Sequence, residues 1–255
     1  MKIQLVRRTL VGALLCAPSV LAGQEPVPAS GTAVLERMRA AYDGKWYHTL
    51  TFAQKTTIYG KDGTKRIQPW RESLRHTAAT GTQLRIDFGD PANGNGVLYT
   101  ADSSWRFSGG KLAAHNADGN AFLPLIEGVY VQPVAKTVAE LASTHVDLCK
   151  VRAGTWMSRP VWVVGTTSAS DTTSPQFWVE VERRVVVRFI MSFAPDSDPF
   201  DVQLDDYVKA GGGMLATKVS MFVKGAPAQI EDYADWRVDV PIADSTFDLK
   251  AWVRP

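Results

Sequence analysis

The feature that most limits how this chain can fold is the alternation in residues 176–191, QFWVEVERRVVVRFIM. Apolar side chains occupy one parity, and most polar or charged side chains occupy the other. Because successive residues of a β-strand point to opposite faces of a sheet, the pattern predicts two paired strands with one apolar face and one polar face. A turn at Glu182 and Arg183 joins them. The apolar face must cover a protein core, a membrane or a ligand.

The first residues of the chain predict where the protein works. Basic residues precede an apolar run from Leu10 to Ala17, Pro18 ends the run, and small residues follow. This order is that of a secretory signal peptide, and the run is too short to span a membrane. We place the cleavage after Ala22, so that residues 1–22 are removed.

Two other export signals match less well. Arg7 and Arg8 resemble a twin-arginine signal, but the residues around them fit it poorly, so general secretion is favoured. Lipidation at Cys16 is disfavoured because Leu15 is too large for the position before a lipidated cysteine. We therefore expect a protein that is secreted into the periplasm and has no transmembrane segment in its mature chain.

Charge and cysteine content narrow the range of partners. The chain has 28 basic and 26 acidic residues, and the signal peptide holds three of the basic residues and no acid. The mature chain is therefore close to neutral, which gives no electrostatic reason to expect a nucleic acid or an anionic membrane surface as partner. Cys149 is the one cysteine that remains, so no disulfide can form within the mature chain.

The rest of the chain is organised as one unit. We expect residues 23–30 to be a flexible linker and residues 31–255 to form a single domain. Residues 32–42 have helical periodicity, and most of the remaining chain has the pattern of short strands separated by turns. We count about ten or eleven strands and few helices, and successive hairpins of this kind predict an antiparallel sheet.

Residues 120–144 interrupt the strand pattern. Their dense apolar cluster is crossed by Pro124 and Gly128, and residues 136–143 favour a short helix. The segment is either a buried connector packed on the sheet, which is the commoner arrangement, or a lid over the mouth of a cavity. The sequence leaves both alternatives open.

Candidate chemical groups are few. His145, Asp147 and Cys149 alternate, so on a strand they would share a face, as metal ligands or parts of a thiol site would. Three groups on one strand cannot surround a metal ion, and a surface His and Asp beside a buried thiol explain the pattern equally well. The sequence contains no nucleophile elbow, phosphate loop or dinucleotide fingerprint. We therefore expect no metal, no cofactor and no enzymatic activity.

Aromatic residues recur in the predicted strands. Trp105 and Phe107 share one parity, and so do Phe177 and Phe189. Such residues build the core and the cross-strand pairs of any sheet. A chain with so few helices cannot cover both faces of so many strands. We therefore expect an apolar guest molecule to occupy the concave side.

The order of the segments resembles the periplasmic lipoprotein-carrier superfamily, which includes LolA, LolB and RseB. The resemblance rests on LERM in the opening helix, LTFAQKT, WRESLR before LRIDF, the hairpin YTADSSWRF, the apolar FLPLI, the hairpin QFWVEVERRVVVRFI, and STFDL near the end. It implies a mostly β fold, a curved antiparallel half-barrel with helices plugging its concave face. It also implies a partner that is an acyl chain, a lipid or a lipidated protein, as in outer-membrane lipoprotein trafficking.

The resemblance implies one site residue directly. In the carrier, an Arg at the end of the strand before the segment that resembles LRIDF holds the lid closed, and the matching residue here is Arg75, followed by His76 in place of Pro. From the alternation and the apolar middle segment, we expect a monomer whose cavity is lined by Trp105, Phe107, Phe122, Leu123, Leu125, Ile126, Phe177, Val179, Val187 and Phe189.

Three other functions compete with ligand carriage. A sensor or adaptor on the same scaffold would have a filled concave face and a protein partner. A secreted hydrolase would need a nucleophile beside a base, and residues 145–149 are the candidates for it. An outer-membrane barrel would carry girdles of Tyr and Trp at its strand ends, which this sequence lacks.

Overall fold

The computed structural model describes residues 25–192 and 197–252. The expected signal peptide, residues 1–22, and the first two residues of the expected linker lie outside the described residues. The helical elements are α1 (Gly31–Ala41), α2 (Val129–Val131) and α3 (Val134–Leu141), the π-helical turn η2 (Pro124–Gly128), and the 3-10 turns η1 (Pro91–Asn93), η3 (Ala142–Thr144), η4 (Asp244–Phe247) and η5 (Leu249–Ala251).

Within the described residues, thirteen strands form one antiparallel sheet that does not close on itself. They are β1 (Thr49–Tyr59), β2 (Lys65–Thr77), β3 (Gly81–Phe88), β4 (Gly96–Tyr99), β5 (Ser104–Ser108), β6 (Lys111–Asn116), β7 (Val151–Trp156), β8 (Arg159–Val164), β9 (Gln176–Glu180), β10 (Val186–Met191), β11 (Phe200–Ala210), β12 (Gly213–Val223) and β13 (Ala226–Val238). The expected half-barrel is confirmed. It has more strands than expected because residues 96–116 form three strands and residues 151–156 add another.

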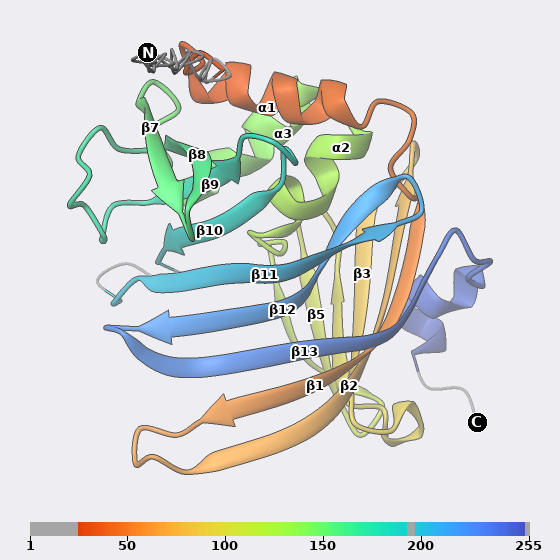
Figure 1. Ribbon diagram of the computed structural model, residues 1–255. Helices are drawn as coiled ribbons and strands as arrows, with labels where there is room; N and C mark the ends of the chain where they lie inside the picture. Colours follow the sequence, from red (N-terminus) through yellow and green to blue (C-terminus); the bar gives the residue numbers. More distant parts are fainter. Residues whose placement is uncertain (1–24, 193–196, 253–255) are drawn as a thin grey trace, which may run out of the picture.

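The connectivity explains why helices lie on the concave face. The strand order is β6-β5-β4-β3-β2-β1-β13-β12-β11-β10-β9-β8-β7, so the chain runs to one edge of the sheet and reappears at the other. The segment between β6 and β7, which contains η2, α2 and α3, must therefore cross the sheet. Figure 1 shows α2 and α3 on the inner side of the curved sheet, with α1 lying across one end of it.

Helix α1 closes that end of the half-barrel. The Ser30 side chain accepts a hydrogen bond from the Ala33 amide (3.2 Å) and so caps the amino terminus of the helix. Val34, Leu35 and Met38 are fully buried, as the helical periodicity predicted. Contacts with α2 and α3 join these three helices into one plug. No helix among the described residues is long and apolar enough to cross a membrane.

The hairpin formed by β9 and β10 is buried on both faces, so its expected division into one apolar and one polar face is wrong. The register shifts between Val186, which lies opposite Val179, and Arg188, which lies opposite Trp178. Such a bulge places two successive residues opposite one. As a result Phe189 shares the concave side with Phe177, whereas Val187 joins a second apolar cluster with Trp178.

The convex face of the other arm of the sheet is also covered. The carboxy-terminal turns η4 and η5 pack outside the sheet, where Figure 1 shows them in dark blue. Phe247 and Trp252 form an apolar cluster there with Leu98 and Phe107. The Phe107 and Trp252 rings stack with their centroids 4.1 Å apart. The sheet therefore has apolar clusters on both faces, and the largest lies between the concave face and the helices.

Candidate functional site

The segment that crosses the concave face is both a packed connector and the cover of a cavity. We call residues 122–131, which contain η2 and α2, the lid. Leu125 and Val129 are fully buried and pack in the main core. Phe122, Leu123 and Ile126 line a cavity on the other side of the lid. The two arrangements that the sequence left open are therefore both present in one segment.

The cavity has two chambers that lie between the lid and the concave face of the sheet. The inner chamber has a volume of about 70 Å³ and the outer chamber about 280 Å³. Together they fall at the lower end of the range for small-molecule sites, roughly 300–1,000 Å³. The chambers share the lining residues Glu72, Leu84, Leu123, Ile126, Leu204, Val219 and Tyr233.

The lining is mostly apolar but differs between the chambers. Trp46 and Tyr130 stack with their ring centroids 3.7 Å apart, and both line the inner chamber. The outer chamber is wider, and Phe88, Tyr99 and Phe189 line it. An apolar guest would therefore be surrounded by side chains of both the sheet and the lid.

Polar side chains of β2 and β13 lie in the wall of the outer chamber. Glu72 and Glu231 both line this chamber and are more than nine-tenths buried. Glu231 accepts hydrogen bonds from Gln229 Nε2 (2.6 Å) and from the Tyr233 hydroxyl (2.7 Å). Burial raises the pKa of Glu231, and these hydrogen bonds oppose that rise.

Glu72 is less well supported than Glu231. No described residue donates a hydrogen bond to its carboxyl group or forms an ion pair with it. Burial, followed by the charge of Glu231, raises the pKa of Glu72 well above its ordinary value. We call Glu72, Glu231 and Tyr233 the polar strip.

A buried glutamate anchors the lid to the rest of the protein. Glu127, on η2, accepts hydrogen bonds from Trp46 Nε1 (2.9 Å) and from the Tyr47 hydroxyl (2.7 Å). The His76 Nε2 atom of β2 lies 3.4 Å from the same carboxyl group, and the other ring nitrogen lies 2.9 Å from the Thr82 hydroxyl. These contacts join the lid to the sheet and to the segment after α1.

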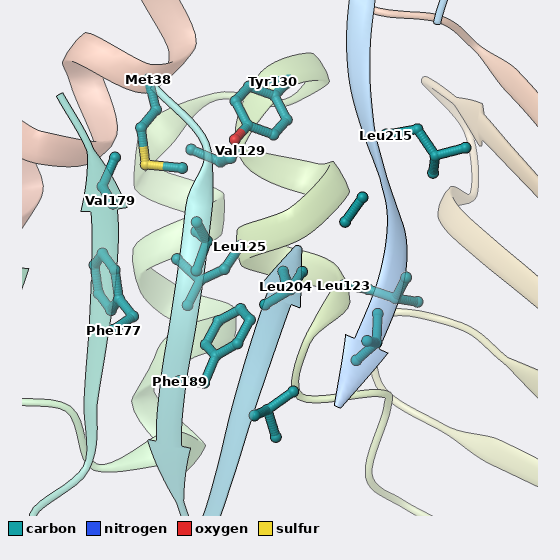
Figure 2. Close-up of a cluster of buried hydrophobic side chains, with 14 of the residues drawn as sticks. Met38, Leu123, Leu125, Val129, Tyr130, Phe177, Val179, Phe189, Leu204 and Leu215 are labelled. Carbon is teal, nitrogen blue, oxygen red and sulfur yellow. The ribbon is translucent and has the colours of Figure 1, made fainter. Parts of the chain in front are cut away.

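The lining residues expected from the sequence fall into three groups. Phe122, Leu123, Ile126 and Phe189 line the outer chamber. The second group, Leu125, Phe177 and Val179, is fully buried in the packed part of the core. Figure 2 shows the members of this second group beside Met38 of α1.

The third group lies on the convex side of the sheet. Trp105 stacks on His115 with ring centroids 5.1 Å apart, and Phe107 packs under the carboxy-terminal turns. Val187 belongs to the second apolar cluster because of the bulge in β10. The concave position on β5 is instead taken by Arg106, whose guanidinium lies 5.2 Å from the centre of the Phe88 ring in the outer chamber.

Arg75, the expected latch, points away from the lid. Its Nε donates a hydrogen bond to Gln83 (2.8 Å), its guanidinium pairs with Asp244, and it lies 4.4 Å from the centre of the Phe247 ring. These contacts are with β3 and the carboxy-terminal turn η4. The next residue, His76, has the opposite parity on β2 and therefore reaches the lid.

The remaining chemical candidates do not form a site. Asp147 accepts a hydrogen bond from the Cys149 amide (3.0 Å), which closes a turn, and Cys149 is exposed. Within residues 25–192 and 197–252, no group of three or more His, Cys, Asp or Glu side chains is placed to hold a metal ion. The sequence did carry a signal for the polar strip, because Glu72 has the same parity as Trp70 and Leu74.

Comparisons with known proteins add the identity of the fold. No protein-family model and no curated protein sequence matches this chain. Among solved structures, a domain described as an outer membrane lipoprotein-sorting protein domain from Vibrio parahaemolyticus has a TM-score of 0.60, at 10% identity over 88% of this chain and 98% of that domain.

Two further structures are similar over almost the same span. A DUF1329 family protein from Desulfovibrio piger has a TM-score of 0.61 at 14% identity, covering 87% of this chain and 97% of that one. A LolA superfamily protein from Nitrosomonas europaea has a TM-score of 0.51 at 13% identity, covering 87% and 98%. The fold expected from the resemblance, that of the lipoprotein-carrier superfamily, is therefore confirmed.

Proposed function

We propose that this protein binds an apolar molecule, such as an acyl chain, a lipid or the lipidated end of a protein, in the cavity between the lid and the sheet. The observation that carries the proposal is the unfilled space beneath an otherwise packed plug. The proposed compartment is the periplasm, in accordance with the signal peptide expected at residues 1–22. Binding rather than catalysis is the proposed activity, and its place would be in lipid or lipoprotein trafficking.

The energetics of such binding are sufficient. Burial of one methylene group stabilises a complex by about 0.8 kcal/mol, so a chain of ~12 carbons contributes on the order of 10 kcal/mol before ordering costs. The shared lining residues Leu84, Leu123 and Val219 supply the apolar contacts. No covalent step is required for capture or release.

The size of the cavity makes the lid part of the proposal. The two chambers are narrow for a long acyl chain, so a guest of that length requires the lid to shift outward. Glu127 is the residue whose contacts would then change, because it joins the lid to Trp46, Tyr47 and His76. Entry and release of a guest would be coupled to these hydrogen bonds.

A neutral fluorescent probe, N-phenyl-1-naphthylamine, tests the proposal directly. We expect saturable fluorescence enhancement with the wild-type protein. Leu204→Trp places a larger side chain among the lining residues that both chambers share and should abolish the enhancement. The matched control, Leu112→Trp, alters an exposed position on the edge strand β6 and should leave binding unchanged.

The cellular guest can be identified by native mass spectrometry of protein released from the periplasm. A bound mass that is lost in Leu204→Trp would support carriage of a lipid. Absence of probe binding, together with co-purification of a protein partner and no lipid, would replace the proposal with an adaptor function on the same scaffold.

A further inference from the structure

The wall of the outer chamber contains two buried carboxyl groups, those of Glu72 and Glu231, and one buried donor without a partner among the described residues, Trp70 Nε1. Glu72 is 8% exposed and has no hydrogen-bond or ion-pair partner among the described residues, although it lines both chambers. Burial of an acceptor without a donor costs about 1–3 kcal/mol, so a guest that brings a donor to Glu72 would remove such a cost.

No cation forms an ion pair with the carboxyl groups of this wall in the described part of the chain. Of the described residues that line the outer chamber, Arg106 is the one cation, and its guanidinium lies over the Phe88 ring. Glu72 is influenced by Glu231, a group of the same sign, and not by Arg106. The third buried carboxyl group, Glu127, is occupied by its hydrogen bonds to Trp46 and Tyr47.

We propose that the cavity selects apolar molecules that carry a positively charged amine, whose ammonium group lies against Glu72 and Glu231. This inference rests on the proposed function and specifies the chemical class of the guest. An ammonium group has three donors and no acceptor, which complements a surface of carboxyl and amide oxygens. The alkyl part of the guest lies along Leu84, Leu123 and Val219, which line both chambers.

The same geometry discriminates against other head groups. A carboxylate guest brings a negative charge beside Glu72, whose ionisation the charge of Glu231 already opposes. An alcohol adds one donor and no charge, so it satisfies the strip only in part. The specificity therefore arises from charge on β2 and β13, while affinity arises from the apolar lining.

Displacement of N-phenyl-1-naphthylamine by dodecylamine, dodecanol and dodecanoate, each below the concentration at which it forms micelles, tests the inference. The three competitors share one chain and differ in head group. We expect dodecylamine to bind at least about tenfold more tightly than dodecanol, a ratio equivalent to ~1.4 kcal/mol. Dodecanoate should be the weakest.

Two isosteric variants locate the effect. Glu72→Gln and Glu231→Gln should reduce the preference for dodecylamine over dodecanol to about twofold or less, a ratio in which any change in affinity common to the two competitors cancels. Saturable binding of the neutral probe verifies that the cavity of each variant still forms. Glu182→Gln, which removes a carboxylate from an exposed turn, is the matched control and should behave like the wild type.

Proton release gives a readout that a purely structural role of Glu72 would not produce. Burial favours the protonated form of Glu72, and an adjacent ammonium group favours the ionised form. Calorimetry at a series of pH values, each in two buffers of different ionisation enthalpy, should therefore detect proton release with dodecylamine but not with dodecanol.

The outcomes separate the two proposals. Equal affinity for all three competitors, or tightest binding of dodecanoate, overturns the amine inference and leaves the apolar-guest proposal standing. No binding of the neutral probe or of any competitor to the wild-type protein overturns both. A preference for dodecylamine that Glu72→Gln does not reduce also overturns the inference, because the cation would then lie elsewhere.

Discussion

The two ends of the concave face differ in how completely they are filled. Beneath α1 and the lid, strands β8 to β10 carry Phe177, Val179 and Trp162, which are at most 1% exposed. We call this the packed half. On the arm formed by β1 to β4 and β11 to β13, inward side chains such as Leu84 and Val219 border empty space. We call this the hollow half.

Strand length accounts for much of the difference. β9 has 5 residues, whereas β13 has 13, and Figure 1 shows the long strands extending beyond the helices. A plug that covers the short strands completely leaves part of the long strands uncovered. The inward-facing carboxyl group of Glu72, which has no ion-pair partner among the described residues, lies in the hollow half. In contrast, Glu180 of β9 pairs with Arg183 and Arg159. We therefore expect stability to depend mainly on the packed half, and the proposed binding to depend on the hollow half.

The sharpest test of this division is Phe177→Ala in the packed half. We expect the free energy of unfolding to fall by about 3–5 kcal/mol, because the surroundings of a fully buried ring cannot collapse around the void. Probe affinity of the protein that remains folded should be unchanged. Denaturant titration and probe fluorescence measure the two quantities.

Leu84→Ala is the counterpart in the hollow half. The side chain already borders empty space, so its loss should cost about 2 kcal/mol, the lower end of the range for such changes. It should also alter probe affinity. Equal costs for both variants, with equal effects on the probe, would show that the two halves are not functionally distinct.

Glu127 joins the lid to Trp46, Tyr47 and His76, and we call these contacts the lid anchor. Glu127→Ala should remove them. The substitution leaves the Trp46 and Tyr47 donors buried without an acceptor, which should cost about 2–4 kcal/mol. Stopped-flow mixing should show faster probe association, because the lid is less firmly held. Glu127→Gln keeps one acceptor and should lie between the alanine variant and the wild type. Unchanged association rates in both variants would separate the anchor from entry.

The general fold followed from the sequence because it depends on local patterns. Alternation, turn residues and one helical stripe act within a few residues, and α1 and α3 were expected close to where they occur. The order of these segments then pointed to the half-barrel. The number of strands was underestimated because β4 to β6 are short and have weak alternation.

The residues that line the cavity were harder to predict from the sequence. Their prediction depends on which side chains of each strand point to the concave face. A single bulge in β10 moves Val187 to the convex side, and no residue type in that stretch marks the bulge. Trp105 and Phe107 face outward because the carboxy-terminal turns cover them, a contact between segments more than a hundred residues apart. Glu72 could have been found, since it occupies an inward position between Trp70 and Leu74.

Substitution of the unpaired carboxyl group should make the hollow half more stable. In the unfolded chain a glutamate ionises near its ordinary pKa of 4.5, whereas the folded protein holds the Glu72 proton to higher pH. The contribution of Glu72 to stability is therefore fully present below pH 4.5 and is lost as pH rises toward the raised pKa. Glu72→Gln should thus raise the free energy of unfolding by about 1–2 kcal/mol at neutral pH and leave it unchanged near pH 4. Thermal denaturation across this range measures the difference, and a stabilisation independent of pH would contradict the assignment.

The smallest expected effect is that of Arg75→Ala, which distinguishes the lid anchor of this protein from the latch implied by its resemblance. The Asp244 partner of Arg75 is 97% exposed, and a salt bridge of this kind contributes about 0–1 kcal/mol, with a further ~0.5 kcal/mol from the contact with Phe247. The free energy of unfolding should therefore fall by about 1 kcal/mol or less. Probe association should keep its wild-type rate, because every contact of the Arg75 side chain is on the convex side. A rate increase comparable to that of Glu127→Ala would return the latch role to Arg75 and require that His76 and Glu127 be only structural.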